Sequence, residues 1–193
     1  MIRPLAALAR DRRGTTLVEF AVLAPTLLVL IMASMELAHQ SYAQSVLEGA
    51  LQKAARDSSL EGGAQRTDAI DDAVKTQIAR VIHGGIYTSS RKSYSNFSNL
   101  KGERFTDNNS NGKRDSGECF DDANGNKTWD ADPGISGQGG ANDVTMYRMQ
   151  VSYPRLFPLA GLLGWPDTRT ISATTYLKNQ PFGTQSAVVT ICT

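Results

Sequence analysis

The stretch that decides the fold reads Gly14-Thr-Thr-Leu-Val-Glu19-Phe-Ala-Val-Leu-Ala-Pro-Thr-Leu-Leu-Val-Leu-Ile-Met-Ala-Ser-Met-Glu36. From Leu17 to Ala38 nearly every residue is apolar or small. At ~1.5 Å rise per residue, a helix over this run is long enough to cross a hydrocarbon core of ~30 Å. Glu19 is an ionisable residue inside the run, where a carboxylate is costly in lipid and therefore points to function. Glu36 falls at the far end, where headgroups and water can solvate it.

Basic residues precede this run, at Arg3, Arg10, Arg12 and Arg13. Such residues hold the preceding segment in the cytoplasm and send the following part across the membrane. We therefore expect a cytoplasmic leader at 1–14, a transmembrane and assembly helix at 15–56, and an extracytoplasmic head at 57–193.

Three interpretations of the N-terminal segment remain open. The first is a secretory signal peptide, with the small residues Ala33 and Ser34 at its cleavage site, although the apolar run exceeds the usual length. The second is an uncleaved signal anchor in which headgroups solvate Glu19. The third is a class III signal cut on the cytoplasmic side after Gly14, which makes Thr15 the new N-terminus.

The third interpretation rests on a resemblance. A basic leader ending in Gly14, with Glu19 five residues later and Phe20 after it, resembles the type IV pilin superfamily. The Ala-Pro pair at 24–25 and the helix continuing to Arg56 resemble the TadE/TadG branch, which comprises pseudopilins of the tight-adherence (Tad, or Flp) pilus system.

The C-terminal part carries the same resemblance. Strand-like segments at 143–154 and 171–178 flank a proline-bounded apolar loop, and the chain then reads Asn-Gln-Pro-Phe at 179–182. TadE-like proteins often have glutamate where Gln180 stands here. The resemblance covers about 15–95 and 143–182, and it omits 101–142, which we interpret as an insertion.

This resemblance implies a minor pilin or pseudopilin that takes part in Tad/Flp pilus biogenesis and surface adhesion. A prepilin peptidase would cut after Gly14, and the helix would stay in the inner membrane before packing among other pilin-like subunits. Glu19 would pair with the new α-amino group of a neighbouring subunit. The implied partners are those subunits, the Tad assembly platform, the peptidase and membrane lipid, with the head in the periplasm or outside the cell.

The expected fold class is α+β, in which the long N-terminal helix continues into a head of a second helix and an antiparallel sheet. After the membrane, apolar residues recur at helical spacing from Tyr42 to Ala54. A second helix is predicted from Thr67 to about His83, with a buried face of Ala69, Ile70, Ala73, Val74, Ile78, Val81 and Ile82. Strands are expected near 93–98, 143–154, 168–178 and 186–192.

The insertion at 101–142 contains a fifteen-residue repeat, with copies at 102–116 and 117–131. The first copy has the spacing of an EF-hand-type calcium loop, with a glycine, Gly112, at loop position 6. Its predicted ligands, at positions 1, 3, 5, 7, 9 and 12, are Asp107, Asn109, Asn111, Lys113 (through its carbonyl), Asp115 and Glu118.

The second copy departs from that pattern. Its predicted ligands are Asp122, Asn124, Asn126, Thr128 (through its carbonyl) and Asp130. Position 12 is Pro133, so the closing glutamate is missing, and Asp132 is the partial substitute. Calcium is the expected cofactor, and the alternative is a solvated cluster of turns, because Asn, Asp and Gly all favour turns.

Cys119 and Cys192 are the two cysteines of the chain. A cysteine pair outside the cytoplasm usually oxidises, so we expect a disulfide that ties the tail to the insertion, with two free thiols as the alternative.

Several classes of function find no support in the sequence. The net charge is +1 and the basic residues form no stripe with aromatic ones, which argues against nucleic-acid binding. The motifs of hydrolases, zinc proteases and phosphate-binding loops are absent, so we expect neither an enzyme nor a small-molecule substrate.

Two other functions remain open. One is a membrane-anchored extracytoplasmic calcium-binding module for adhesion or sensing, without a role in a pilus. The other is a pseudopilin of a type II secretion machine, which shares the N-terminal pattern.

Overall fold

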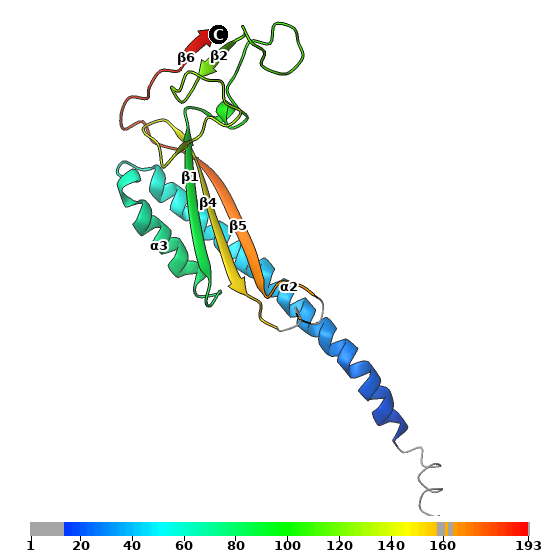
Figure 1. Cartoon of the computed structure of the whole chain (residues 1–193). Helices are drawn as coiled ribbons and strands as arrows, with labels where there is room; N and C mark the ends of the chain where they lie inside the picture. The colour runs from blue at the N-terminus through cyan, green and yellow to red at the C-terminus, as the bar shows by residue number, and fades with distance from the viewer. Residues whose placement is uncertain (1–13, 158–160, 162–163, 193) are drawn as a thin grey trace, which may run out of the picture. The chain divides into compact units, whose positions relative to one another are not determined.

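The computed structural model describes residues 14–157, 161 and 164–192, so the predicted leader lies outside the described residues except for Gly14. The chain divides into two compact units. The first, here the helix unit, comprises Met1–Ser41 and Arg155–Asp167. The second, here the head unit, comprises Tyr42–Pro154 and Thr168–Thr193. The long helix α2 (Thr15–Ser59) runs from one unit into the other and ends three residues beyond the predicted boundary (Figure 1).

The head unit is built on a four-stranded antiparallel sheet in the order β3-β1-β4-β5. Its strands are β1 (Ile86–Tyr94), β3 (Ile135–Ser136), β4 (Val144–Pro154) and β5 (Thr168–Lys178). The central strand β4 pairs along its length with β1 on one side and β5 on the other. Inward and outward residues alternate along β4, so one face of the sheet is buried, as period-2 patterning requires.

The core lies between that face and two helices, the part of α2 after Ser41 and α3 (Thr67–Ile78), which Figure 1 shows beside the sheet. Leu47 and Leu51 of α2 are buried, one turn apart, and Ile78 of α3 is fully buried. The core cluster consists of Ala43, Leu47, Ala50, Leu51, Ala54, Ala55, Ile70, Val74, Ile78, Ile82, Tyr147, Met149, Val151, Tyr153, Ile171, Ala173 and Leu177. This is the α+β fold that the sequence predicts.

A buried ion pair joins α3 to the sheet. The Arg91 guanidinium donates to the Asp71 carboxylate, and both side chains are 8% exposed. The Tyr147 hydroxyl donates to the same carboxylate, and the guanidinium lies 3.9 Å from the centre of the tyrosine ring. Burial raises the pKa of Asp71, but hydrogen bonds from Arg91, Ser89 and Tyr147 outweigh this effect and hold that pKa below its usual value.

A second, two-stranded antiparallel sheet pairs β2 (Cys119–Asp122) of the insertion with the C-terminal strand β6 (Val189–Cys192). Two short 3-10 helices complete the described elements: η1 (Ala64–Arg66) and η2 (Phe97–Asn99). The last strand thus falls inside the segment predicted for it.

Three sequence predictions in the head were wrong. The strand expected at 93–98 is β1, which ends at Tyr94, and the Asn96 side chain then caps η2 by accepting from the N–H groups of Ser98 and Asn99. Helix α3 ends at Ile78, five residues before His83, although Ile82 is still buried. Ala69 and Ala73, which we predicted to be buried, are exposed.

Candidate functional site

The N-terminal part of α2 presents apolar side chains outward. Phe20 is 67% exposed, Leu23 67% and Leu27 54%, and the most apolar window of the helix has a mean hydropathy of 2.2 with no residue buried. Pro25 lies within this helix without ending it. Among the described residues, α2 is the helix that is long and apolar enough to cross a membrane. It therefore has the properties of a membrane anchor.

The residues predicted for processing lie at the start of this helix. Gly14 directly precedes α2, and the N–H of Val18 donates to the Gly14 carbonyl at 3.1 Å, so helical hydrogen bonding begins at Gly14. Thr15 is the first helical residue, and Glu19 is exposed one turn further on. The carboxylate of Glu19 is thus presented outward among apolar side chains.

The first repeat copy forms a closed polar loop, here loop 1 (107–118). The Asp107 carboxylate accepts from the N–H groups of Asn111 (3.1 Å) and Gly112 (2.8 Å). One oxygen of Asp115 accepts from the side-chain amides of Asn109 (2.8 Å) and Asn111 (2.7 Å). The side chains of Asp107, Asn109, Asn111 and Asp115, four of the predicted ligands, therefore belong to one hydrogen-bond network. The backbone N–H of Lys113 adds to it by donating to the Asn111 side chain at 2.8 Å.

The second copy repeats this network bond for bond in loop 2 (122–132). Asp122 accepts from the N–H groups of Asn126 (3.1 Å) and Lys127 (3.0 Å). Asp130 accepts from the side-chain amides of Asn124 (2.8 Å) and Asn126 (2.6 Å). Thr128 donates its N–H to Asn126 at 2.7 Å, as Lys113 does to Asn111 in loop 1.

Loop 2 is closed by a glutamate that the sequence prediction missed. In loop 1, the Glu118 carboxylate accepts from the N–H groups of Asn108 (2.7 Å) and Asp115 (2.9 Å). In loop 2, Glu103 accepts from the N–H groups of Ala123 (2.7 Å) and Asp130 (2.9 Å). These are equivalent bonds at equivalent loop positions, and both glutamates are buried. Each loop is therefore closed by the glutamate that begins the other copy.

Two equivalent backbone hydrogen bonds join the two copies. The N–H of Thr106 donates to the Cys119 carbonyl at 2.8 Å, and the N–H of Asp121 donates to the Arg104 carbonyl at 2.9 Å. These residues occupy equivalent places fifteen residues apart, so the copies face each other across an approximate twofold relation. The signal for Glu103 was therefore in the repeat itself, because Glu103 and Glu118 are the same residue of the two copies.

Asp132, the predicted substitute ligand of the second copy, does not join the loop 2 network. Its carboxylate accepts from the Lys92 ammonium and from the Tyr94 hydroxyl, the latter at 2.9 Å. The structure thus uses Asp132 to fasten the insertion to β1.

Within the described ranges, no group of three or more His, Cys, Asp or Glu side chains is gathered closely enough to hold a metal ion. In both loops the acidic oxygens accept from backbone N–H groups and asparagine amides instead. The donor types are nonetheless those that Ca²⁺ takes, namely carboxylate, amide and backbone carbonyl oxygens. Calcium binding by these loops stays a prediction.

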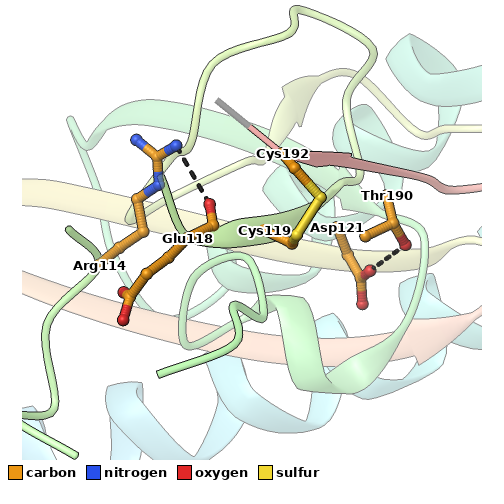
Figure 2. The surroundings of a disulfide bond; sticks show 6 residues. All are labelled: Arg114, Glu118, Cys119, Asp121, Thr190 and Cys192. Carbon is orange, nitrogen blue, oxygen red and sulfur yellow. Dashed lines mark hydrogen bonds between the residues drawn. A yellow bond between two sulfur atoms is a disulfide. The ribbon is translucent and has the colours of Figure 1, made fainter. Parts of the chain in front are cut away.

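The two cysteines form a disulfide, with an S–S distance of 2.02 Å and a sequence separation of 73 residues. The bond joins β2 to β6, and Figure 2 shows it next to Glu118, the last residue of loop 1. The Thr190 hydroxyl donates to Asp121 at 2.8 Å on the same ladder, and Arg114 reaches the carbonyl of Glu118. The C-terminal strand is therefore tied to the insertion, as we expected for an oxidised pair.

A comparison of the chain with curated proteins finds no match, and neither does a comparison with solved structures. Residues 14–56 match the family model described as TadE-like protein, and they coincide with the exposed apolar helix and its continuation into the head. Over this segment, the chain is similar to TadE-like proteins.

Proposed function

We propose that this protein is a TadE-like pilus assembly subunit, a minor pilin or pseudopilin of the Tad/Flp type. The observation that carries the proposal is the exposed apolar helix that begins at Thr15, directly after Gly14, and presents Glu19 one turn later, inside the segment that matches the TadE-like family. The helix anchors the chain in the inner membrane with its N-terminus in the cytoplasm, and the head unit projects from the other side.

Glu19 has a specific role in this proposal. A carboxylate in a low-dielectric surrounding is stabilised strongly by an opposite charge and is costly without one. Cleavage after Gly14 by a prepilin peptidase creates an α-amino group at Thr15 in the same apolar region. Pairing between Glu19 of one subunit and that amino group of another sets the register in which pilin-like helices pack.

The first test is mass spectrometry of the N-terminus of protein isolated from membranes, with and without a prepilin peptidase. The proposal expects a chain starting at Thr15 only when the peptidase is present. An intact leader in both samples would contradict processing and favour the plain anchored module.

The second test separates a pilus subunit from an anchored module. Glu19→Ala is expected to abolish pilus assembly at an unchanged membrane level, because the charge pair is lost while the apolar anchor stays. Glu48→Ala, on an exposed surface of the same helix, is the matched control and should assemble normally. Normal assembly of both variants would contradict the role of Glu19. If secretion is lost and pili persist on deletion of the protein, the type II pseudopilin is favoured.

We further propose that the insertion binds calcium in both loops and thereby supports contacts of the head with the filament or a surface. Glu118 completes loop 1 and Glu103 completes loop 2. Their carboxylates lie against each loop at equivalent places, and each loop supplies two further acidic side chains and two asparagines. When bound, Ca²⁺ would supply the positive charge that these buried carboxylates lack.

Terbium luminescence tests loop 2 selectively, since Trp129 lies within that loop and can sensitise a bound lanthanide. Glu103→Gln is expected to abolish the calcium-competed terbium signal of the full chain in detergent. Asp132→Asn is the matched control and should keep the signal, because Asp132 bonds to Lys92 and Tyr94. Loss of the terbium signal in the Asp132 variant alone would show that Asp132, and not Glu103, completes loop 2. Absence of the signal in the wild type would contradict calcium binding in loop 2.

A further inference from the structure

The apolar loop between β4 and β5, residues 155–167, belongs to the same compact unit as the N-terminal part of α2. Its sequence from Leu156 to Pro166 contains no ionisable residue and is rich in leucine. Of its described side chains, Leu156 is 49% exposed and Trp165 is 53% exposed. An apolar side chain therefore faces outward at each described end of the loop.

A buried ion pair fixes this loop to one height on α2. The Arg155 guanidinium lies 3.7 Å from the Glu36 carboxylate, and the two side chains are 10% and 12% exposed. The N–H of Leu156 also donates to Glu36, at 3.2 Å. Arg155 then reaches the far end of the loop, where its Nε donates to the Pro166 carbonyl at 2.8 Å and its guanidinium lies 5.4 Å from the Trp165 ring centre.

That height matches the outer edge of a bilayer. Glu36 lies 21 residues after Thr15, which at ~1.5 Å per residue places it about 32 Å along the helix axis. This is close to the ~30 Å thickness of a hydrocarbon core. No ionisable residue lies between Phe20 and Met35, so Glu36 is the first charge after Glu19. The loop is thus attached at the point where the apolar helix would leave the lipid.

The chemistry of the attachment fits an interface. Arg155 neutralises Glu36, so neither charge has to be solvated fully at the edge of the hydrocarbon. Tryptophan favours the level of the headgroups, where its ring is in apolar surroundings and its N–H can reach water. The exposed Leu156 side chain gains by leaving water for the acyl boundary.

We propose that the β4–β5 loop is a second membrane contact of this protein, which inserts Trp165 and Leu156 into the headgroup boundary of the leaflet on the head side. The partner is the lipid surface. This inference rests on the proposed membrane anchor, and the test below separates the failure of one from the failure of the other.

The test uses the full chain in vesicles of phosphatidylcholine and phosphatidylglycerol, with lipids brominated high on their acyl chains as quenchers. The signal of Trp165 is the difference between the wild type and Trp165→Phe. We expect brominated lipid to reduce this signal about twofold, as for tryptophan at the interface. Trp129, which remains in Trp165→Phe, lies in the insertion and should be unaffected.

A reporter in the helix makes each outcome decisive. Leu27→Trp in the Trp165→Phe background should be quenched strongly by lipids brominated deep in their chains. If that reporter is quenched and Trp165 is not, the loop does not contact lipid and the inference is overturned while the anchor stands. If neither is quenched, both are overturned. If Trp165 is shielded from acrylamide but not quenched by lipid, protein covers it, and the inference is again overturned.

The ion pair has its own test. Arg155→Gln removes the charge that joins loop and helix and should at least halve the quenching of Trp165 by brominated lipid. Glu48→Gln, on the same helix within the head unit, is the control and should leave the quenching unchanged. Full quenching in Arg155→Gln would overturn the role assigned to the pair.

Discussion

The helix–sheet core and the insertion of the head unit are ordered by different forces. The core buries leucine, isoleucine, valine and methionine from two helices and from strands β4 and β5. The insertion buries the carboxylates of Glu103, Glu118 and Asp122, with Phe120 as its large buried apolar side chain. Apolar burial is non-directional and tolerant, whereas buried polar groups are stable only when every partner is in place. We therefore expect the core to respond to volume and the insertion to respond to connectivity.

The largest expected effect is in the core. Leu47→Ala removes a fully buried side chain from the contact of α2 with the sheet and should lower the free energy of unfolding of the head by about 4 kcal/mol. Urea unfolding of the full chain in detergent, followed by tyrosine fluorescence, measures it. Leu27→Ala on the exposed apolar part of the same helix is the control. Equal losses in both variants would contradict the division of α2 between two environments.

Beside the apolar core, the ion pair between Asp71 and Arg91 is stable only while both partners are present. Asp71→Asn leaves a buried guanidinium without its carboxylate and should cost about 3 kcal/mol at neutral pH. The pKa of Asp71 is lowered in the folded state, so its stabilising contribution is present above the unfolded value of about 3.9 and is lost as pH falls through the folded pKa. The difference in stability between the wild type and Asp71→Asn should therefore shrink below about pH 4. A difference that stays constant between pH 6 and pH 3 would contradict this assignment.

The disulfide should matter to the insertion and little to the core. Cys192→Ser releases β6 from β2 and should destabilise this two-stranded sheet by about 2 kcal/mol, at the low end for disulfide loss because the sheet is short. Hydrogen exchange measured by mass spectrometry is expected to quicken in 119–122 and stay unchanged in 144–153. Quickened exchange throughout β4 would show instead that the two regions unfold together.

The smallest effect comes from one backbone position of loop 2. Lys127 has a φ of 65° where the equivalent residue of loop 1, Gly112, has 75°. A residue with a Cβ is strained in this left-handed region, so Lys127→Gly should stabilise loop 2 by about 0.5–1 kcal/mol. Lys113→Gly, at the next position of loop 1, is the control, and slower exchange in 122–130 of the Lys127 variant alone is the expected result.

The parts that the sequence predicts well are those in which one periodicity dominates. β4 and β5 lie within one residue of their predicted bounds, because apolar and polar residues alternate along both. The part of β1 before Ser93 was not predicted, because its inward side chains include Ser89 and Arg91, which bury polar groups against Asp71. The sequence of such a strand shows no alternation of apolar and polar residues. Its inward polar side chains are explained by their contact with Asp71 of α3, which is distant in sequence.

The candidate sites show the same limit. Gly14, Thr15 and Glu19 are close in sequence, and the helix orders them as their spacing predicts. The spacing of the repeat predicted the acidic residues and asparagines that form both loop networks, and it predicted Glu118 as the closing residue of loop 1. Glu103 was missed because it precedes its loop by nineteen positions and belongs to the other copy. A linear sequence motif can describe only a loop whose ligating residues all lie within it. Loop 2 takes its closing glutamate from outside the loop.

The exchange of glutamates between the copies has an evolutionary consequence. A single fifteen-residue unit has its glutamate at its beginning, whereas its loop needs a glutamate from elsewhere to accept the N–H groups that close it. A single unit therefore has a loop without a closing carboxylate. Duplication in tandem supplies both closures at once, since the second unit closes the first and the first folds back to close the second. An in-frame deletion of either copy would also remove the glutamate that closes the loop of the remaining copy. The insertion is therefore inherited or lost as a pair, and genomes that carry a shortened form of this protein should lack both copies together.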